Sequence, residues 1–276
     1  MNRPNDATRR WLKHFRDNAA NFLPIPWEKG ADLDHAELAA IASSIQAFQL
    51  GESSEGRHLM RYAREWAARS GDADYVDAIR ALIAEETRHA RDLGRLMDLN
   101  AIPRIGRRWT DTVFRRLRNA FGTLEISIAV LVTAEIIAKV YYVALRDATQ
   151  SVVLRTICDQ ILRDEFKHVE FQTEQLAIIR REHNVARLTI TMLLQRVLFI
   201  GTVAIVNWSH RRAFARGGYS WRAFRLACMT EFARDLRAMD PRGNPAVIDV
   251  HQPARSTDVA CDAVGMLEGL PAANMD

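Results

Sequence analysis

Apolar residues recur every three or four positions through most of this chain, and this spacing is typical of one face of an α-helix. The pattern holds over residues 35–69, 74–100, 124–147 and 152–182. Only a few residues join the first helix to the second and the third to the fourth, whereas a longer stretch separates the two pairs. Because helices joined by short turns pack antiparallel, the pattern predicts an all-α protein built on a four-helix bundle.

The stretch between the two pairs, residues 101–121, contains a proline, a glycine and many arginines. Its length predicts a long crossover rather than a tight turn, and residues 110–120 could form a helix within it. Before the bundle, two prolines interrupt residues 1–33, which predicts an N-terminal arm with one short helix near residues 9–22.

A further apolar helix is predicted after the bundle, at residues 186–214. Its apolar run is nearly long enough to cross a bilayer, which takes about 20 residues. Gln195 and Arg196 interrupt the run, and an arginine at the bilayer centre costs at least about 2.5 kcal/mol. We therefore expect this helix to pack on the bundle, and we do not expect membrane association.

The expected parts of the chain follow from these patterns. They are an N-terminal arm at 1–33, a helical domain at 34–240 and a C-terminal tail at 241–276. The helical domain contains the core bundle at 36–182 and the additional C-terminal helices at 186–239. The additional N-terminal helix lies in the arm.

The charged residues of the chain indicate which kinds of partner it could bind. Lysine and arginine total 38 residues, of which only four are lysines, and the net charge is +4. Arginines cluster at 104–118 and 211–225, where they could meet phosphates or acidic lipid head groups. A solvated basic face is the simpler interpretation because no nucleic-acid motif accompanies them, so a nucleic-acid partner is not expected, although the arginines leave it open.

Three distant cysteines without a CxxC pair, and no apolar secretory segment, predict a cytoplasmic protein.

Polar residues interrupt the apolar stripe of each of the four bundle helices. The second and fourth helices each carry a Glu-x-x-His sequence, whose two side chains lie on one helix face. Two glutamates, Glu52 and Glu55, interrupt the stripe of the first helix, and Glu135 lies in the middle of the third. The six candidate residues are Glu52, Glu86, His89, Glu135, Glu165 and His168. Antiparallel pairing can bring each single glutamate level with the Glu-x-x-His of its partner helix, so we expect all six to converge in the middle of the bundle.

Four carboxylates and two imidazoles suit two divalent iron or manganese ions. Carboxylate oxygens can bridge two ions and offset their charge, and one imidazole per ion leaves room for dioxygen or peroxide. A structural zinc site would use cysteines, and calcium would prefer a loop of oxygen ligands.

Residues 36–182 resemble the ferritin-like di-iron carboxylate superfamily, whose members carry these ligands in this order. The local likeness is to rubrerythrins, whose first and second helices are similar to LGESSEGRHLMRYA and AEETRHARDL. The resemblance implies a ferritin-like bundle in which the six residues bind two iron ions, or one iron and one manganese. It also implies an external electron donor, because the rubredoxin-like CxxC pairs of rubrerythrins are absent.

Several assignments stay open at this stage. Glu55 could replace Glu52 as a ligand, since Glu55 begins a third Glu-x-x-His sequence that ends at His58. His58 itself could be an extra ligand or a surface histidine. An ion pair with Lys139, one turn further along the helix, is the alternative to metal ligation by Glu135.

Four neighbouring residues also have two interpretations. Glu85, Asp164 and Glu170 could orient the ligands or simply be solvated. Tyr142, two turns after Glu135, could donate a hydrogen bond near the metals or be an ordinary core tyrosine.

The function expected from these residues is that of a non-haem di-iron oxidoreductase that activates dioxygen or peroxide, such as an oxygenase or hydroxylase of an unidentified small molecule. The alternative is non-enzymatic binding of iron or manganese for storage or protection against oxidative stress. A third interpretation is a buried polar network without metal. The extra helices could seal a substrate pocket or a subunit interface, and a homodimer is compatible with them.

Overall fold

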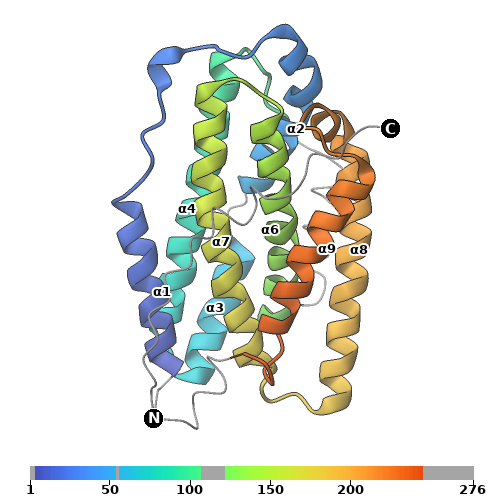
Figure 1. Ribbon diagram of the computed structural model, residues 1–276. Helices are drawn as coiled ribbons and strands as arrows, with labels where there is room; N and C mark the ends of the chain where they lie inside the picture. The colour runs from blue at the N-terminus through green and yellow to red at the C-terminus, as the bar shows by residue number, and fades with distance from the viewer. Residues whose placement is uncertain (1–3, 54–55, 107–121, 245–276) are drawn as a thin grey trace, which may run out of the picture.

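The computed structural model describes residues 4–53, 56–106 and 122–244, and these residues form helices and connecting turns without a strand (Figure 1). Four helices correspond to the predicted bundle: α2 (His35–Glu52), α4 (Asp74–Leu99), α6 (Leu124–Asp147) and α7 (Val152–Arg180). The prediction of an all-α chain is confirmed. The predicted helix at 110–120 and nearly all of the C-terminal tail lie outside the described residues.

Polar side chains begin the bundle helices where the sequence changes from turn to apolar stripe. Asp34 and Glu37 form a reciprocal capping box at the start of α2. Thr123 and Ser151 accept hydrogen bonds from backbone N–H groups in the first turns of α6 and α7. These caps set the register of the helices and so the level at which each site residue enters the bundle.

The first predicted helix, residues 35–69, is in fact two helices. Helix α2 ends at Glu52, and α3 (Arg57–Ser70) begins after Gly56, whose φ of 61° is a left-handed conformation that favours glycine. A Cβ at this position would lie 2.5 Å from Cδ1 of Ile83 in α4. The apolar stripe continues through the break, which is why helical spacing alone predicts one helix.

Helices outside the bundle cover two of its sides (Figure 1). They are α1 (Pro4–Ala19), α8 (Val185–Arg216) and α9 (Trp221–Ala238). Helix α1 packs along α4, whereas α8 packs against α6 and α2, and α9 packs against α7 and α6. The expected additional helices at both ends of the core are therefore present, and the expectation that residues 186–214 pack on the bundle is confirmed.

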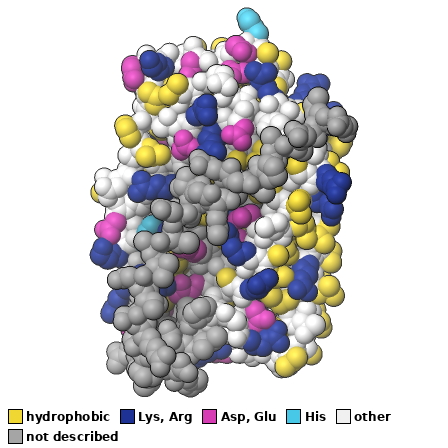
Figure 2. All heavy atoms as spheres, viewed as in Figure 1, with side chains coloured by type: hydrophobic (Ala, Val, Ile, Leu, Met, Phe, Trp, Pro, Cys, Tyr) yellow, Lys and Arg dark blue, Asp and Glu magenta, His cyan; other side chains and the backbone are white. Residues whose placement is uncertain are grey.

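Within the described ranges, two helices, α6 and α8, are long and apolar enough to cross a membrane by length and composition alone. In the most apolar stretch of α6, 83% of the residues are buried inside the protein, which marks a core helix. The corresponding share in α8 is only 28%, and hydrophobic side chains mixed with arginines are visible along the edge that α8 and α9 form (Figure 2).

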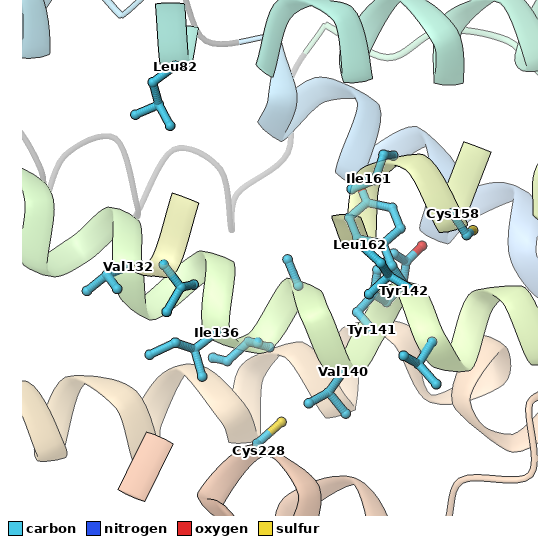
Figure 3. Packing of buried hydrophobic residues seen from close by; sticks show 14 of the residues in the cluster. Leu82, Val132, Ile136, Val140, Tyr141, Tyr142, Cys158, Ile161, Leu162 and Cys228 are labelled. Carbon is cyan, nitrogen blue, oxygen red and sulfur yellow. The ribbon is translucent and has the colours of Figure 1, made fainter. Parts of the chain in front are cut away.

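The apolar core surrounds α6 and extends from the bundle to α9 (Figure 3). Ile136 and Val140 of α6 belong to the same buried cluster as Ile161 of α7 and Cys228 of α9. Because α6 is apolar nearly all round, its neighbours bury it on every side. Any polar side chain on this helix therefore requires a partner inside the protein.

Candidate metal centre

The six residues predicted from the sequence lie together in the middle of the bundle. They form two groups, in each of which one atom per residue lies within 4.8 Å of the others. One group is Glu52, Glu86, His89 and Glu165, and the other is Glu86, Glu135 and His168. Glu86 belongs to both groups, so a single carboxylate connects the two halves of the cluster.

Four helices supply these side chains. Glu52 is the last residue of α2, and Glu135 lies in the middle of α6. Helices α4 and α7, which carry the two Glu-x-x-His sequences, pack against each other. The two imidazole rings lie 5.9 Å apart between their centroids, so the two sequences meet across this helix pair.

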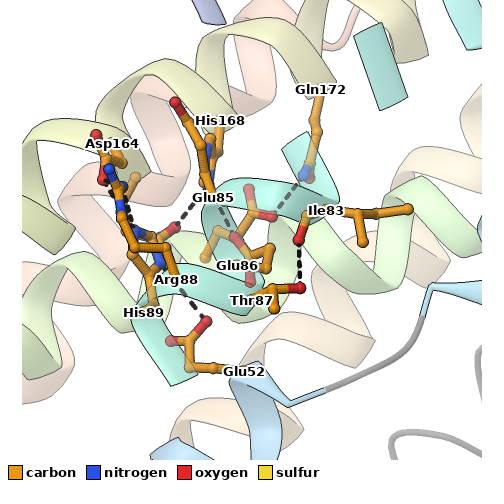
Figure 4. A network of polar contacts seen from close by, with 12 residues as sticks. Glu52, Ile83, Glu85, Glu86, Thr87, Arg88, His89, Asp164, His168 and Gln172 are labelled. Carbon is orange, nitrogen blue, oxygen red and sulfur yellow. Dashed lines mark hydrogen bonds and ion pairs between the residues drawn. The ribbon is translucent and has the colours of Figure 1, made fainter. Parts of the chain in front are cut away.

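Each histidine is oriented by a carboxylate from the opposite helix (Figure 4). Nε2 of His89 lies 2.9 Å from Oδ2 of Asp164, and Nε2 of His168 lies 2.7 Å from Oε2 of Glu85. Both carboxylates directly precede the glutamate of the other Glu-x-x-His sequence. With Nε2–H donated to a carboxylate, Nδ1 of each ring faces the cluster, and loss of the Nδ1 proton would leave a lone pair for a metal, as in metal-binding histidines.

The three neighbouring carboxylates therefore differ: two of them orient the histidines, and the third is solvated. Glu85 and Asp164 are buried and hold the histidines. Glu170 is exposed, and its Oε2 pairs with Nζ of Lys167 at 2.8 Å. Its position is that of a solvated surface residue.

Helix α1 contributes a hydrogen-bond donor to the carboxylates that orient the histidines. Helical spacing within the bundle did not predict this contribution. Nδ2 of Asn18 lies 2.5 Å from Glu85 and 2.8 Å from Asp164, so it donates to both orienting carboxylates. Nε2 of Gln160 donates to Asp164 at 2.9 Å, and Arg88 forms an ion pair with the same carboxylate. A signal for Asn18 exists in the sequence, because it continues the helical spacing of the buried Trp11 and Phe15.

The two single glutamates have one neutral hydrogen-bond donor each. The hydroxyl of Tyr142 donates to Oε1 of Glu52 at 2.7 Å, and Nε2 of Gln172 donates to Oε1 of Glu135. Tyr142 is thus both a buried core residue and a hydrogen-bond donor to the cluster.

Lys139 does not pair with Glu135. Its Nζ lies 2.7 Å from Glu231 and 3.1 Å from Asp235, both on α9. The alternative of an ion pair with Glu135 within α6 is therefore wrong, because the ammonium group of Lys139 is held by the two carboxylates of α9.

The other open assignment concerns the third Glu-x-x-His sequence. Glu52 lies in the cluster and His58 is exposed at the start of α3. Glu55 falls outside the described residues, so its position is not compared with that of Glu52.

Several buried atoms of the cluster have no hydrogen-bond partner among the described residues outside the cluster, and two of them, Nδ1 of His168 and Oε1 of Glu86, lie 3.0 Å apart. The full set is Oε1 of Glu86, Nδ1 of His89, Oε2 of Glu135, Oε2 of Glu165 and Nδ1 of His168. A buried polar atom without a partner costs about 1–3 kcal/mol. All five belong to the residues of the two groups, and a divalent cation in each group would be coordinated by atoms of this kind.

Burial and mutual repulsion shift the pKa values of the carboxyl groups. Burial, reinforced by the nearby charge of Glu86, raises the pKa of Glu52 to about 7 and that of Glu135 to about 8. The same causes raise the pKa of Glu165 well above its ordinary value. Burial would also raise the pKa of Glu86, but hydrogen bonding and attraction to His168, with attraction to His89, lower it to about 2.

The histidines respond to the negative charge around them. Burial lowers the pKa of His89, but the hydrogen bond to Asp164 and the nearby negative charges of Glu52 and Glu86 outweigh it and raise that pKa to about 9. Without metal, the cluster therefore retains protons near neutral pH, and a bound cation would take their place.

Comparison with models of known protein families, with curated proteins and with solved structures finds no match for this chain. The class of protein is therefore defined by the fold and the site alone. The chain is an all-helical protein with a buried cluster of glutamates and histidines that could bind a metal.

Proposed function

We propose that this protein is a non-haem di-metal oxidoreductase of the ferritin-like kind, which uses two iron ions, or one iron and one manganese, to activate dioxygen or peroxide. The observation that carries the proposal is the division of the cluster into two groups that share Glu86. A shared carboxylate between two groups that each contain a histidine is the arrangement that two neighbouring divalent cations require.

The residues have distinct parts in this proposal. Glu52 and His89 would hold one cation, Glu135 and His168 would hold the other, and Glu86 would bridge them. Glu165 belongs to the first group, and its Oε2 also lies 3.8 Å from Nδ1 of His168 in the second, so it suits a second bridging position. Two divalent cations bound in this way would supply two electrons, one from each ion, for the reduction of dioxygen or peroxide.

The protein around the cluster would bind, orient and shield the reacting groups. Glu85 and Asp164 keep the histidine Nδ1 atoms directed inward, and burial excludes bulk water. Tyr142 holds a proton on its hydroxyl oxygen, 2.7 Å from Glu52, at the edge of the cluster. We expect the remaining electrons to come from a separate donor protein or from an organic substrate.

The test begins with protein freed of metal and loaded with ferrous iron without oxygen. We expect about two irons per chain, followed by rapid oxygen uptake in an oxygen electrode when air-saturated buffer is added. A His58→Ala variant is the matched control, because it removes the exposed histidine of the third Glu-x-x-His sequence and should leave both values unchanged. Fewer than about one iron per chain would contradict the proposal, and continued iron uptake far beyond two per chain would favour storage instead.

A further inference from the structure

The outward face of α8 is an apolar surface that the residues described by the structure leave uncovered. Five large apolar side chains on it are each 55–62% exposed: Ile190, Leu193, Leu194, Val197 and Ile200. Trp208 continues the same face and is 60% exposed. At 1.5 Å per residue, the face from Ile190 to Trp208 is about 27 Å long. An exposed apolar surface of this extent indicates a site of interaction.

The charge on this face has a single sign. Helix α8 contains five arginines and no aspartate, glutamate or lysine. Arg187, Arg196, Arg211 and Arg212 are exposed. Arginines therefore lie at both ends of the apolar face and beside its middle, as in helices that lie at the surface of an anionic membrane.

Helix α9 extends the same charge pattern next to α8. Its exposed charged side chains are four arginines, Arg222, Arg225, Arg234 and Arg237. Its two acidic residues, Glu231 and Asp235, are turned inward to the buried Lys139, with Arg234 also contacting them. The exposed surface of these two helices, both of which the structure describes completely, thus carries positive charge and no acidic side chain.

The inner face of α8 is fixed to the bundle by buried polar contacts. Nε2 of Gln195 donates to the carbonyl of Ala129 at 2.9 Å and to Thr133 at 3.0 Å. The buried Arg180 donates to Oε1 of Gln195 at 3.1 Å. If α8 left the bundle to cross a bilayer, these groups would lose their partners, so α8 is suited to lie on a membrane rather than to span it.

We propose that the outward face of α8, with the adjoining start of α9, binds the surface of an anionic lipid bilayer. Helix α8 would lie parallel to the bilayer, with its apolar side chains among the acyl chains and its arginines at the phosphates. Charge complementarity favours this occupant over a second copy of the chain, because two copies of the face would bring arginines against arginines. Membrane association was not expected from the sequence, although the arginines at 211–225 could meet acidic lipid head groups, because the sequence does not show which side of residues 186–214 faces outward.

Vesicle flotation tests the proposal with the full chain. The probes are vesicles of phosphatidylcholine alone and of phosphatidylcholine mixed with phosphatidylglycerol, each at low and high salt. We expect binding to the anionic vesicles that weakens with salt. A blue shift of tryptophan fluorescence should accompany it, because Trp208 and Trp221 lie on the binding side.

Variants separate the apolar and the ionic contributions. The double substitution Leu193→Gln and Val197→Gln should weaken binding at least about tenfold. Arg196→Gln should weaken binding to anionic vesicles about fivefold. The matched control is Val152→Gln, which changes an equally exposed apolar residue (53%) at the start of α7 and should leave binding unchanged. Iron content and thermal unfolding show that each variant is folded.

Two results would overturn the proposal. One is that the protein binds neither kind of vesicle. If the protein is then a dimer in solution, and the Leu193→Gln, Val197→Gln variant is a monomer, the face is a self-interface instead. The other is vesicle binding that this double variant leaves at the wild-type strength.

Discussion

Glu86 differs from the other cluster residues because its carboxylate belongs to both groups. Glu135 belongs to one group only. Replacing either residue with glutamine keeps the shape of the side chain but removes its negative charge. The two substitutions should therefore have different effects on metal content.

We predict that Glu86→Gln lowers the iron content from about two to well below one per chain, whereas Glu135→Gln leaves about one. The reason is that each cation needs the shared carboxylate to offset its charge. Metal analysis after anaerobic loading measures both values. Equal losses in the two variants would show that Glu86 does not bridge.

The raised pKa values predict how the metal-free protein responds to pH. Glu52 and Glu135, with pKa values raised to about 7 and 8, retain protons in the folded state that the unfolded chain releases above its ordinary carboxyl pKa. Each therefore makes the folded state less stable as the pH rises toward its folded pKa. His89, with its pKa raised to about 9, acts in the same direction, because its stabilising contribution is lost as the pH rises through that value.

We expect the melting temperature of metal-free protein to fall by about 5–10 °C between about pH 5 and pH 8.5. Glu135→Gln should raise the melting temperature at the alkaline end by about 2–4 °C, because it removes a buried carboxylate that lacks a cation. Thermal unfolding followed by circular dichroism measures both changes. A melting temperature that is constant or rises over this interval would contradict the assigned shifts.

Single residues were predictable where helical spacing determines their position. The three-residue spacing of Glu86 and His89 places both on one face, and the structure places them in the cluster. Helical spacing indicates that Asn18 lies on the buried face of α1, but the hydrogen bonds of Asn18 and Gln172 depend on how α1 and α7 dock and were not predictable. The ion pair of Lys139 with Glu135 stayed open as an alternative to metal ligation, because the sequence does not show that the partners of Lys139 lie on α9.

At the level of secondary structure, the four bundle helices follow from the apolar pattern, but the break between α2 and α3 does not. The break depends on a glycine conformation and on the close approach of α4, which are properties of the packed structure. Its consequence is that Glu52 lies at the end of a helix rather than in the middle of one.

Alanine substitutions test the reason for this break. Gly56→Ala should cost about 2–4 kcal/mol, because the left-handed φ is unfavourable for alanine and the new methyl group meets Ile83 at 2.5 Å. Gly71→Ala is the matched control, since Gly71 has a φ of 73° but no atom within 4 Å of the added Cβ, and it should cost about 1 kcal/mol. Urea unfolding measures both losses, and equal losses would show that contact with Ile83 is not the cause.

The whole molecule consists of two similar helix pairs and the helices packed around them. Each pair supplies one glutamate and one Glu-x-x-His sequence, and each Glu-x-x-His sequence is preceded by the carboxylate that orients the histidine of the other. The sequence shows this internal repetition, and it explains why one cluster forms from residues that are more than 100 positions apart. The exposed face of α8 was not predictable, because an apolar helix of this length has the same composition whether one side or all sides are buried.

The most direct measurement is anomalous X-ray scattering at the iron and manganese edges, on crystals of protein purified without added metal. We predict two peaks about 3.5–4 Å apart. One should lie beside Glu52 and His89, the other beside Glu135 and His168, with the Glu86 carboxylate between them. Crystals that show no peak in this cluster after anaerobic loading with ferrous iron, or a peak only at another place in the chain, would contradict the account.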